Sequence, residues 1–225
     1  GASDQILELA DTDLRHHFAQ FLGDEEEVVD HVLRLAGEAL TGSVILYAVY
    51  GGLMAALFEE TGRYIAMRFL VKPMDFPNAF MYGAGHGGVE AMLLCGVASI
   101  SNIASAVMIN SGTMSAQLAT LDAEKAADTA AALSALWTTP SLTFFAGGVE
   151  RIIAVVLHLS LSILVFQSIR KKAPMELVRA YLFHFVIDSL SVLLSAVASV
   201  WVVELVVALV TGGAVLMAKY ACMEE

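Results

Sequence analysis

The chain has 225 residues, of which 58% are hydrophobic, and its mean hydropathy is +0.72. Soluble domains are usually about 45–50% apolar, so this composition excludes an ordinary water-soluble domain. The net charge of −11 and the lack of a basic patch interleaved with aromatic residues exclude nucleic acid as a partner. Few prolines, many Ala, Leu and Met residues, and no alternating strand pattern favour helices over a barrel.

Residues 1–40 differ from the rest because apolar side chains recur among polar ones at helical spacing. The apolar positions are Leu7, Leu14, Phe18, Phe21, Val28, Val32, Leu35 and Ala39. Such spacing is typical of amphipathic helices. We therefore predict two amphipathic helices in residues 1–40, on the membrane surface or over the bundle, and a membrane domain in residues 41–218.

Five later segments are apolar enough to cross a lipid bilayer, which requires about 20 helical residues. They are residues 41–70, 85–109, 141–169, 175–197 and 199–218. No polar loop separates the last two, so Val200–Glu204 is the expected place for a tight turn. Residues 112–139 are polar and Ala-rich, which predicts an extramembrane connection with a short helix. The sequence thus predicts an all-α, polytopic transmembrane helical bundle.

Basic residues near the ends of the spans indicate an orientation. They are Arg68, Lys72, Arg170, Lys171, Lys172, Arg179 and Lys219. With alternating spans all of them fall on one side, which the positive-inside rule assigns to the cytoplasm. The acidic N-terminal segment and residues 112–139 then lie outside. A start outside the membrane also leads us to expect further spans upstream.

Four of the spans contain groups of ionisable residues, although a charge at the bilayer centre costs roughly 2.5–3.5 kcal/mol on insertion scales. These residues fall in groups that share a helix face. The groups are Glu59 and Arg63 with Glu60 beside them, His86 and Glu90, Arg151 and His158 with Glu150 beside them, and His184 and Asp188. His184 lies about 14 Å into its span from the cytoplasmic side, at 1.5 Å per residue. The orientation places all four groups in the cytoplasmic half, so we expect them to meet.

The chemistry of this set suits a metal site. Two or three His residues with carboxylates are typical Zn²⁺ ligands, with a position left open for water. A nearby Glu can act as general base toward that water. Arg63 and Arg151 can hold carboxylates or stabilise an oxyanion. Asp188 fits either a direct ligand or a carboxylate that orients His184.

Each residue taken alone also has a structural interpretation. A single intramembrane His is more often a hydrogen-bonded structural residue, and Glu59 with Arg63 would fit a buried ion pair. His86 lies among glycines, where it could cap a helix. The glycines of residues 83–88 lack the Lys of a phosphate loop and predict close helix contact instead. The occurrence of polar groups on four helices at one depth favours the metal site.

These motifs resemble those of the YhfC-type membrane peptidases, which belong with the CAAX-protease and bacteriocin-processing superfamily and the PrsW-type proteases. The resemblance covers about residues 5–218 and rests on Glu59-Glu60-Thr61-Gly62-Arg63, Gly85-His86-Gly87-Gly88-Val89-Glu90, Glu150-Arg151 leading to His158, and His184 with Asp188. The Glu-Glu-x-x-Arg spacing is one residue shorter than in CAAX proteases, so their substrate is not carried over.

The resemblance implies roles for the residues. It makes Glu59 the catalytic base, with Glu60 beside it, and it makes His158 and His184 the expected metal ligands, with Asp188 four residues after the last His. Together with the chemistry of the set, this assigns Glu59, Glu60 and Arg63 as catalytic residues, His86, His158, His184 and Asp188 as the metal site, and Glu90, Glu150 and Arg151 as supporting residues. Which of His86, Glu60 and Asp188 touch the metal directly stays open at this point.

The implied function is a zinc-dependent intramembrane endopeptidase of a prokaryotic plasma membrane. A zinc-bound water would attack a bond of a peptide or membrane-protein substrate. Two other functions stay open. One is a non-catalytic membrane binding or immunity-type protein with a structural metal and ion-pair node. The other is a proton- or ion-coupled transporter, for which intramembrane Glu, His and Asp are also typical, although no inverted repeat is evident.

Overall fold

A computed structural model describes residue 37, residues 39–40 and residues 42–223. The amphipathic helices expected in residues 1–40 therefore fall almost entirely outside the described residues. The chain divides into two compact units, Gly1–Tyr50 and Gly51–Glu225. All the polar motifs of the membrane spans lie in the second unit, which is described below by itself.

The described residues form helices and contain no strand. In chain order the elements are α2 (Val44–Ile65), the π-helical η1 (Ala66–Leu70), α3 (Phe76–Ala91), the π-helical η2 (Met92–Gly96), α4 (Val97–Ser111), α5 (Thr113–Leu118), α6 (Ala123–Thr138), α7 (Ser141–Lys171), α8 (Pro174–Ser195) and α9 (Val200–Met223). Five segments are long and apolar enough to span a membrane: Val44–Leu70, Phe76–Ser111, Ser141–Lys171, Pro174–Ser195 and Val200–Met223. This confirms the predicted all-α, polytopic bundle.

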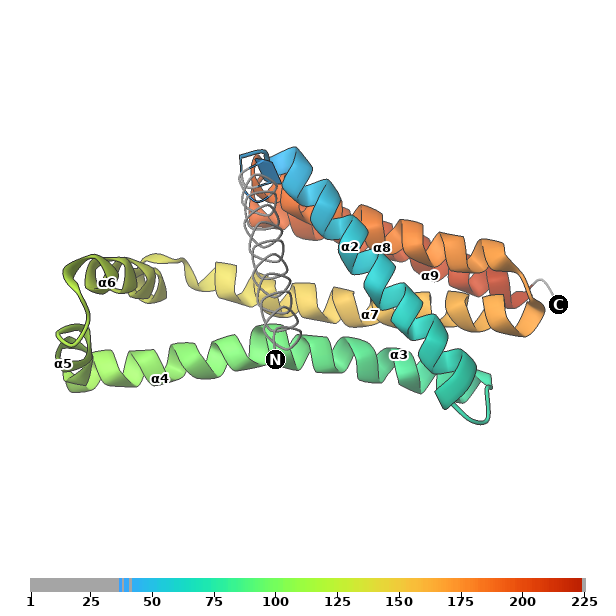
Figure 1. Ribbon diagram of the computed structural model, residues 1–225, viewed down its shortest axis with the longest axis horizontal. Helices are drawn as coiled ribbons and strands as arrows, with labels where there is room; N and C mark the ends of the chain where they lie inside the picture. Colours follow the sequence, from blue (N-terminus) through green and yellow to red (C-terminus); the bar gives the residue numbers. More distant parts are fainter. Residues whose placement is uncertain (1–36, 38, 41, 224–225) are drawn as a thin grey trace, which may run out of the picture. The chain divides into compact units, whose positions relative to one another are not determined.

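Helix α7 is the centre of the second unit. It packs against α3 on one side and against α8 and α9 on the other, and α8 also packs against α9 (Figure 1). The buried core lies mainly along the second half of α7 and includes Leu157, Leu161, Leu164, Val165 and Phe166. Large apolar side chains such as Ile152, Leu205, Leu209 and Leu216 point outward and are exposed. An apolar outer surface of this kind is what a helix bundle presents to lipid.

Glycine allows the close approach of α3 to α7. A Cβ placed on Gly83 would lie 2.9 Å from the His158 carbonyl oxygen, and one on Gly87 would lie 3.0 Å from Val155 Cα. Gly85 and Gly88, on the same helix, would meet nothing within 4 Å. The expected role of these glycines in close helix contact is therefore confirmed for Gly83 and Gly87.

Three expectations about boundaries were wrong. Helix α3 begins at Phe76, nine residues before the expected start, because Asp75 caps it by accepting a hydrogen bond from Asn78 N at 3.0 Å. His86 therefore lies in mid-helix and is not a cap. The tight turn between the last two spans lies at residues 196–199, since the Ser199 carbonyl already accepts from Val202 N. Residues 112–139 form two helices, α5 and α6, where one was expected.

Candidate metal centre

Helix α2 contributes two neighbouring carboxylates that point in different directions. Successive helical residues are rotated by about 100°, so Glu59 and Glu60 leave α2 in different directions, and each lies near a different ring nitrogen of His184. Glu60 is fully buried, whereas the Glu59 side chain is 33% exposed. Glu60 Oε2 lies 3.0 Å from Arg63 Nε, and Glu60 Oε1 lies 2.8 Å from His184 Nδ1. Glu60 therefore connects α2 to α8, and Glu59 is left to face a cavity.

Arg63 is fully buried and ties α2 to α7. Its Nη1 donates to the His158 carbonyl oxygen at 3.0 Å and to Ser162 Oγ at 2.5 Å, and its Nη2 donates to His158 Nδ1 at 2.8 Å. A guanidinium has no acceptor, so His158 Nδ1 must accept this bond. A neutral His158 then carries its proton on Nε2, which lies 2.5 Å from Glu90 Oε2.

His184 has the opposite arrangement. Its Nδ1 faces the Glu60 carboxylate and so donates, which leaves the lone pair of Nε2 free. That Nε2 lies 3.4 Å from Asp188 Oδ2 and 3.8 Å from Glu59 Oε2. A metal-ligating His usually donates its second ring N–H to a carboxylate or carbonyl. His184 therefore has the environment of a prepared metal ligand.

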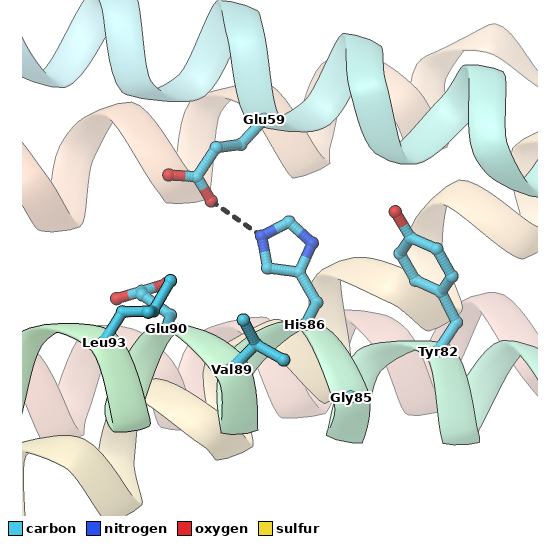
Figure 2. A pocket seen from close by; sticks show the side chains of 7 residues that line it. All are labelled: Glu59, Tyr82, Gly85, His86, Val89, Glu90 and Leu93. Atoms are coloured by element: carbon cyan, nitrogen blue, oxygen red, sulfur yellow. Dashed lines mark hydrogen bonds and ion pairs between the residues drawn. The ribbon is translucent and has the colours of Figure 1, made fainter. Parts of the chain in front are cut away.

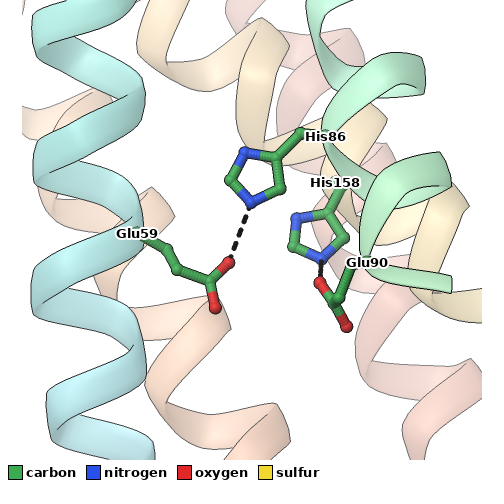
Figure 3. Close-up of side chains that lie close together, drawn as sticks. All are labelled: Glu59, His86, Glu90 and His158. Carbon is green, nitrogen blue, oxygen red and sulfur yellow. Dashed lines mark hydrogen bonds and ion pairs between the residues drawn. The ribbon is translucent and has the colours of Figure 1, made fainter. Parts of the chain in front are cut away.

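His86 completes the group of imidazoles. Its Nε2 lies 3.0 Å from Glu59 Oε2, and its ring stacks on that of His158 with a centroid distance of 4.7 Å. The His158 and His184 rings meet edge to face at 5.7 Å. Three imidazoles from α3, α7 and α8 thus direct Nε2 toward carboxylates of one group. Figure 3 shows the contacts of His86 with Glu59 and of His158 with Glu90.

Four of these side chains offer donor atoms that lie within 4.8 Å of one another: Glu59, His86, Glu90 and His158. Nitrogen and carboxylate donors in one small group suit Zn²⁺, whose ligand bonds are about 2.0–2.2 Å long. Two of the contacts, from His86 to Glu59 and from His158 to Glu90, are direct hydrogen bonds or ion pairs at 3.0 and 2.5 Å. The donor types and their spacing fit a zinc ion that would replace these contacts.

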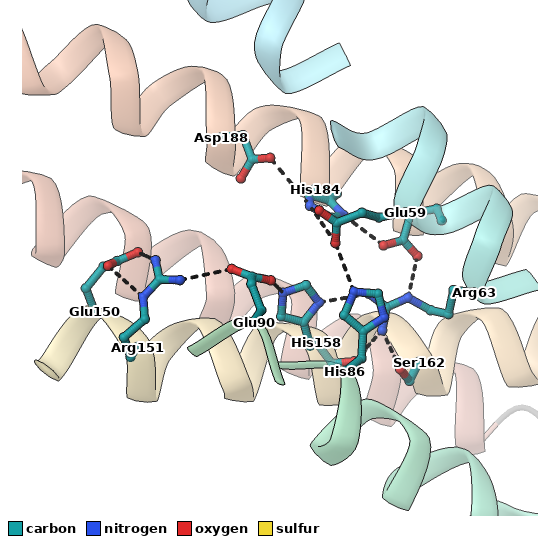
Figure 4. A network of polar contacts seen from close by, with 11 residues as sticks. Glu59, Arg63, His86, Glu90, Glu150, Arg151, His158, Ser162, His184 and Asp188 are labelled. Atoms are coloured by element: carbon teal, nitrogen blue, oxygen red, sulfur yellow. Dashed lines mark hydrogen bonds and ion pairs between the residues drawn. The ribbon is translucent and has the colours of Figure 1, made fainter. Parts of the chain in front are cut away.

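Arg151 holds the opposite end of the group. Its Nη1 donates to Glu90 Oε1 at 2.9 Å, and its Nε donates to Glu150 Oε2 at 2.9 Å. Its Nη2 also pairs with Glu150, so that carboxylate is held by two donors. Because Glu90 contacts both Arg151 and His158, the ion pairs continue from Glu150 into the metal centre (Figure 4).

Two cavities reach the centre. One, of about 590 Å³, lies between α2 and α3 and is lined by Glu59, Tyr82, Gly85, His86, Val89, Glu90 and Leu93 (Figure 2). The other, of about 470 Å³, lies beside α7, α8 and α9, and its walls include Glu90, His184 and Asp188. Glu59 lines both cavities, so its carboxylate is accessible from either one.

The structure brings the ten residues singled out in the sequence into one connected set, and the roles assigned to them stay predictions. The hydrogen bond from Arg63 to His158 joins the two halves of the set. The connected residues are Glu59, Glu60, Arg63, His86, Glu90, Glu150, Arg151, His158, His184 and Asp188. Sequence reasoning missed Ser162, which accepts from Arg63. Its position one helical turn after His158 was the signal that could have found it. The cytoplasmic depth of the site also stays a prediction.

Comparison with known proteins agrees with the resemblance seen in the sequence. Residues 18–207 match the family described as YhfC intramembrane metalloprotease. The chain is also 37% identical over 197 residues to the uncharacterized membrane protein YhfC of Bacillus subtilis (strain 168), across 86% of this chain and 75% of that protein. No solved structure matches the chain. The extent of these matches shows that this integral, multi-pass membrane protein belongs to the YhfC intramembrane metalloprotease family.

Proposed function

We propose that this protein is a zinc-dependent intramembrane endopeptidase that cleaves a membrane-associated peptide or protein. The observation that carries the proposal is the convergence of Glu59, His86, Glu90 and His158 donor atoms within 4.8 Å inside apolar helices. Ionisable groups in such helices are costly to insert, and they usually mark a functional site. The family name supports a metal-dependent peptidase, and the activity itself remains our proposal.

The imidazoles that would hold zinc are those of His86 and His158, which belong to the donor group, and that of His184, whose Nε2 lies beside the group at 3.8 Å from Glu59 Oε2. His184 fits this role best, because Glu60 accepts from its Nδ1. His158 differs, because Arg63 donates to its Nδ1 and its Nε2 therefore carries a proton. Ligation by His158 requires that proton to leave, and Glu90 Oε2 at 2.5 Å is the nearby acceptor.

When bound, zinc supplies a Lewis acid that polarises a peptide carbonyl and acidifies water. The chain's own residues then have separate tasks. Glu59 is partly exposed at both cavities and acts as the general base that takes the proton from the attacking water. Arg63 is buried with its donors engaged by Glu60, His158 and Ser162, so it positions the site and does not contact substrate.

The cavity between α2 and α3 is the proposed place for the substrate. Its walls combine apolar side chains, such as Val89 and Leu93, with the polar Glu59 and His86. An apolar peptide segment can therefore lie against α3 while its backbone carbonyl faces the donor group. Val89 and Leu93 are themselves exposed on the outer face of the bundle, which is consistent with entry from the lipid.

The experiment that tests the proposal replaces Glu59 with Gln. We expect Glu59→Gln to abolish cleavage of a peptide library by the full chain in lipid nanodiscs, while zinc content and thermal stability stay near wild type. The control is Glu124→Gln, which changes an exposed carboxylate on α6. Full activity of Glu59→Gln would overturn the role of the base.

The same preparation separates the two other functions. Stoichiometric zinc with no turnover of any peptide would favour a structural metal node. Absence of zinc binding, together with ion or proton flux in liposomes, would favour a transporter.

A further inference from the structure

A third cavity, of about 580 Å³, lies behind the metal centre, between the first turns of α7 and α9 and the last turns of α8. It shares Glu150, Ser191, Val192 and Val207 with the 470 Å³ cavity that reaches the donor group. The two cavities are therefore neighbours with a common wall. We call this third cavity the rear cavity. A side chain bound in it would lie next to the cavity that Glu59, the proposed general base, lines.

Glu204 is the unexplained residue of the rear cavity. It lines the cavity, its relative exposure is only 8%, and its Oε2 is buried without a hydrogen-bond partner. Within the described part of the chain it makes no ion pair. A buried polar group with no partner costs free energy, and a buried carboxylate costs more. A ligand that brings a positive charge would remove this cost.

Two serines of the mostly apolar cavity wall also present hydroxyl oxygens as hydrogen-bond acceptors. Ser191 Oγ donates its proton to the Ile187 carbonyl at 2.8 Å, and Ser195 Oγ donates to the Ser191 carbonyl at 2.6 Å. With their protons used, these hydroxyl oxygens can only accept further bonds. The nearest cation in the ion-pair chain, Arg151, is already paired with Glu150 and Glu90. Among the described residues that line the cavity there is no Lys, Arg or His to pair with Glu204.

We propose that the rear cavity binds the ammonium or guanidinium group of a Lys or Arg side chain in the substrate. Ammonium and guanidinium groups only donate, so they complement the Glu204 carboxylate and the two serine oxygens. The apolar stem of such a side chain would pass Val192 and Val207, as long basic side chains do when they cross apolar surroundings. This assignment rests on the proposed peptidase function, and it predicts cleavage near a basic residue in an otherwise apolar segment.

A thiol placed in the cavity tests its charge preference without any need for turnover. We would introduce Ser195→Cys into the full chain with Cys95→Ala and Cys222→Ser, in nanodiscs. The rate at which a cationic methanethiosulfonate labels this thiol would be compared with the rate for an anionic one. Each rate is first divided by the rate of the same reagent with a free thiol in water. We expect a preference of about tenfold for the cationic reagent, because clefts lined by one sign of charge concentrate counter-ions.

Substitution of Glu204 decides whether that residue is responsible. Glu204→Gln should remove most of the preference and Glu204→Asp should retain it, whereas Glu124→Gln on α6 should leave it unchanged. No preference, or a preference that survives Glu204→Gln, would overturn the proposal. Thr143→Cys, at another wall of the same cavity, replaces Ser195→Cys if that variant does not fold.

Protection of the thiol by peptides tests the substrate class. The probes are two apolar peptides that differ only in one central residue, Lys or norleucine, scanned along the segment. The Lys peptides should slow labelling of Ser195→Cys and the norleucine peptides should not. Equal protection at every position would overturn the basic-residue assignment. Labelling needs no cleavage. Lys-selective protection without cleavage of any peptide would therefore contradict only the peptidase proposal.

Discussion

Two arginines hold the candidate metal centre from opposite ends, and their surroundings differ. Arg63 is fully buried and its donors contact Glu60, His158 and Ser162, which joins α2 to α7. Arg151 is 18% exposed and contacts Glu150 on its own helix and Glu90 on α3, beside a cavity.

The difference in burial indicates that Arg63 and Arg151 have different roles in this protein. The buried ion pair of Arg63 is desolvated, so loss of one partner leaves an uncompensated charge in the core. The pairs of Arg151 lie next to a cavity, so their loss is partly compensated by solvent. We therefore expect the Arg63 end to control folding and the Arg151 end to adjust the site.

The largest expected effect is that of Arg63→Met. The substitution leaves Glu60 as a buried carboxylate without its cation, which typically costs about 3–5 kcal/mol. The measurement is the free energy of unfolding in mixed micelles. Lys125→Gln, which breaks an exposed pair on α6, is the matched control and should cause no measurable change. A small effect for Arg63→Met would remove the distinction between the two ends.

The next effect concerns zinc affinity. Glu60→Gln weakens the acceptor that orients His184, and loss of such an orienting partner typically lowers metal affinity about 10–100-fold. Competition with a chelating dye measures the affinity. The carboxylate of Glu150 contacts Arg151 and reaches the imidazoles only through Glu90. Glu150→Gln should therefore lower zinc affinity less than Glu60→Gln. Equal losses in the two variants would argue against Glu60 as the residue that orients His184.

A pair of neighbouring glycines gives a third test. A Cβ on Gly87 would lie 3.1 Å from His158 Cβ, so Gly87→Ala must push α3 from α7 at a cost of about 1–3 kcal/mol. Gly88→Ala meets nothing within 4 Å and should stabilise the helix by up to about 1 kcal/mol. Unfolding and zinc titration of both variants measure the contrast. Destabilisation by Gly88→Ala equal to that by Gly87→Ala would refute the close contact.

Much of the centre was predictable because helical spacing fixes which residues share a face. The spacing of His184 and Asp188 anticipated a contact that is found at 3.4 Å. Spacing does not say how a helix is rotated toward its neighbours. The sequence therefore allowed Arg63 to pair with Glu59, four residues before it, whereas in the structure it pairs with Glu60, three residues before it.

The spacing of residues in the sequence could not predict which side chains on different helices contact one another. His86 and Glu90 share a face, but His86 contacts Glu59 on α2 and Glu90 contacts His158 on α7. Glu204 was missed for a different reason. The turn was expected at Val200–Glu204, whereas α9 begins at Val200 and places Glu204 inside the helix. A boundary error of one turn thus concealed a buried carboxylate.

The smallest expected effect is that of Arg151→Lys, which is measured against the same substitution at Arg63. Lysine keeps the charge but loses the planar set of donors, so the change is not conservative where several partners are engaged. Arg63→Lys should lower the free energy of unfolding clearly, because one ammonium cannot serve Glu60, His158 and Ser162 together. Arg151→Lys should lower it by less than about 1 kcal/mol, since its pairs are partly solvated. Unfolding of both variants in the same micelles measures the gap. If Arg151→Lys proved as destabilising as Arg63→Lys, the exposed end would be as rigid a part of the fold as the buried one, and its cavity would have no freedom to adjust to a substrate.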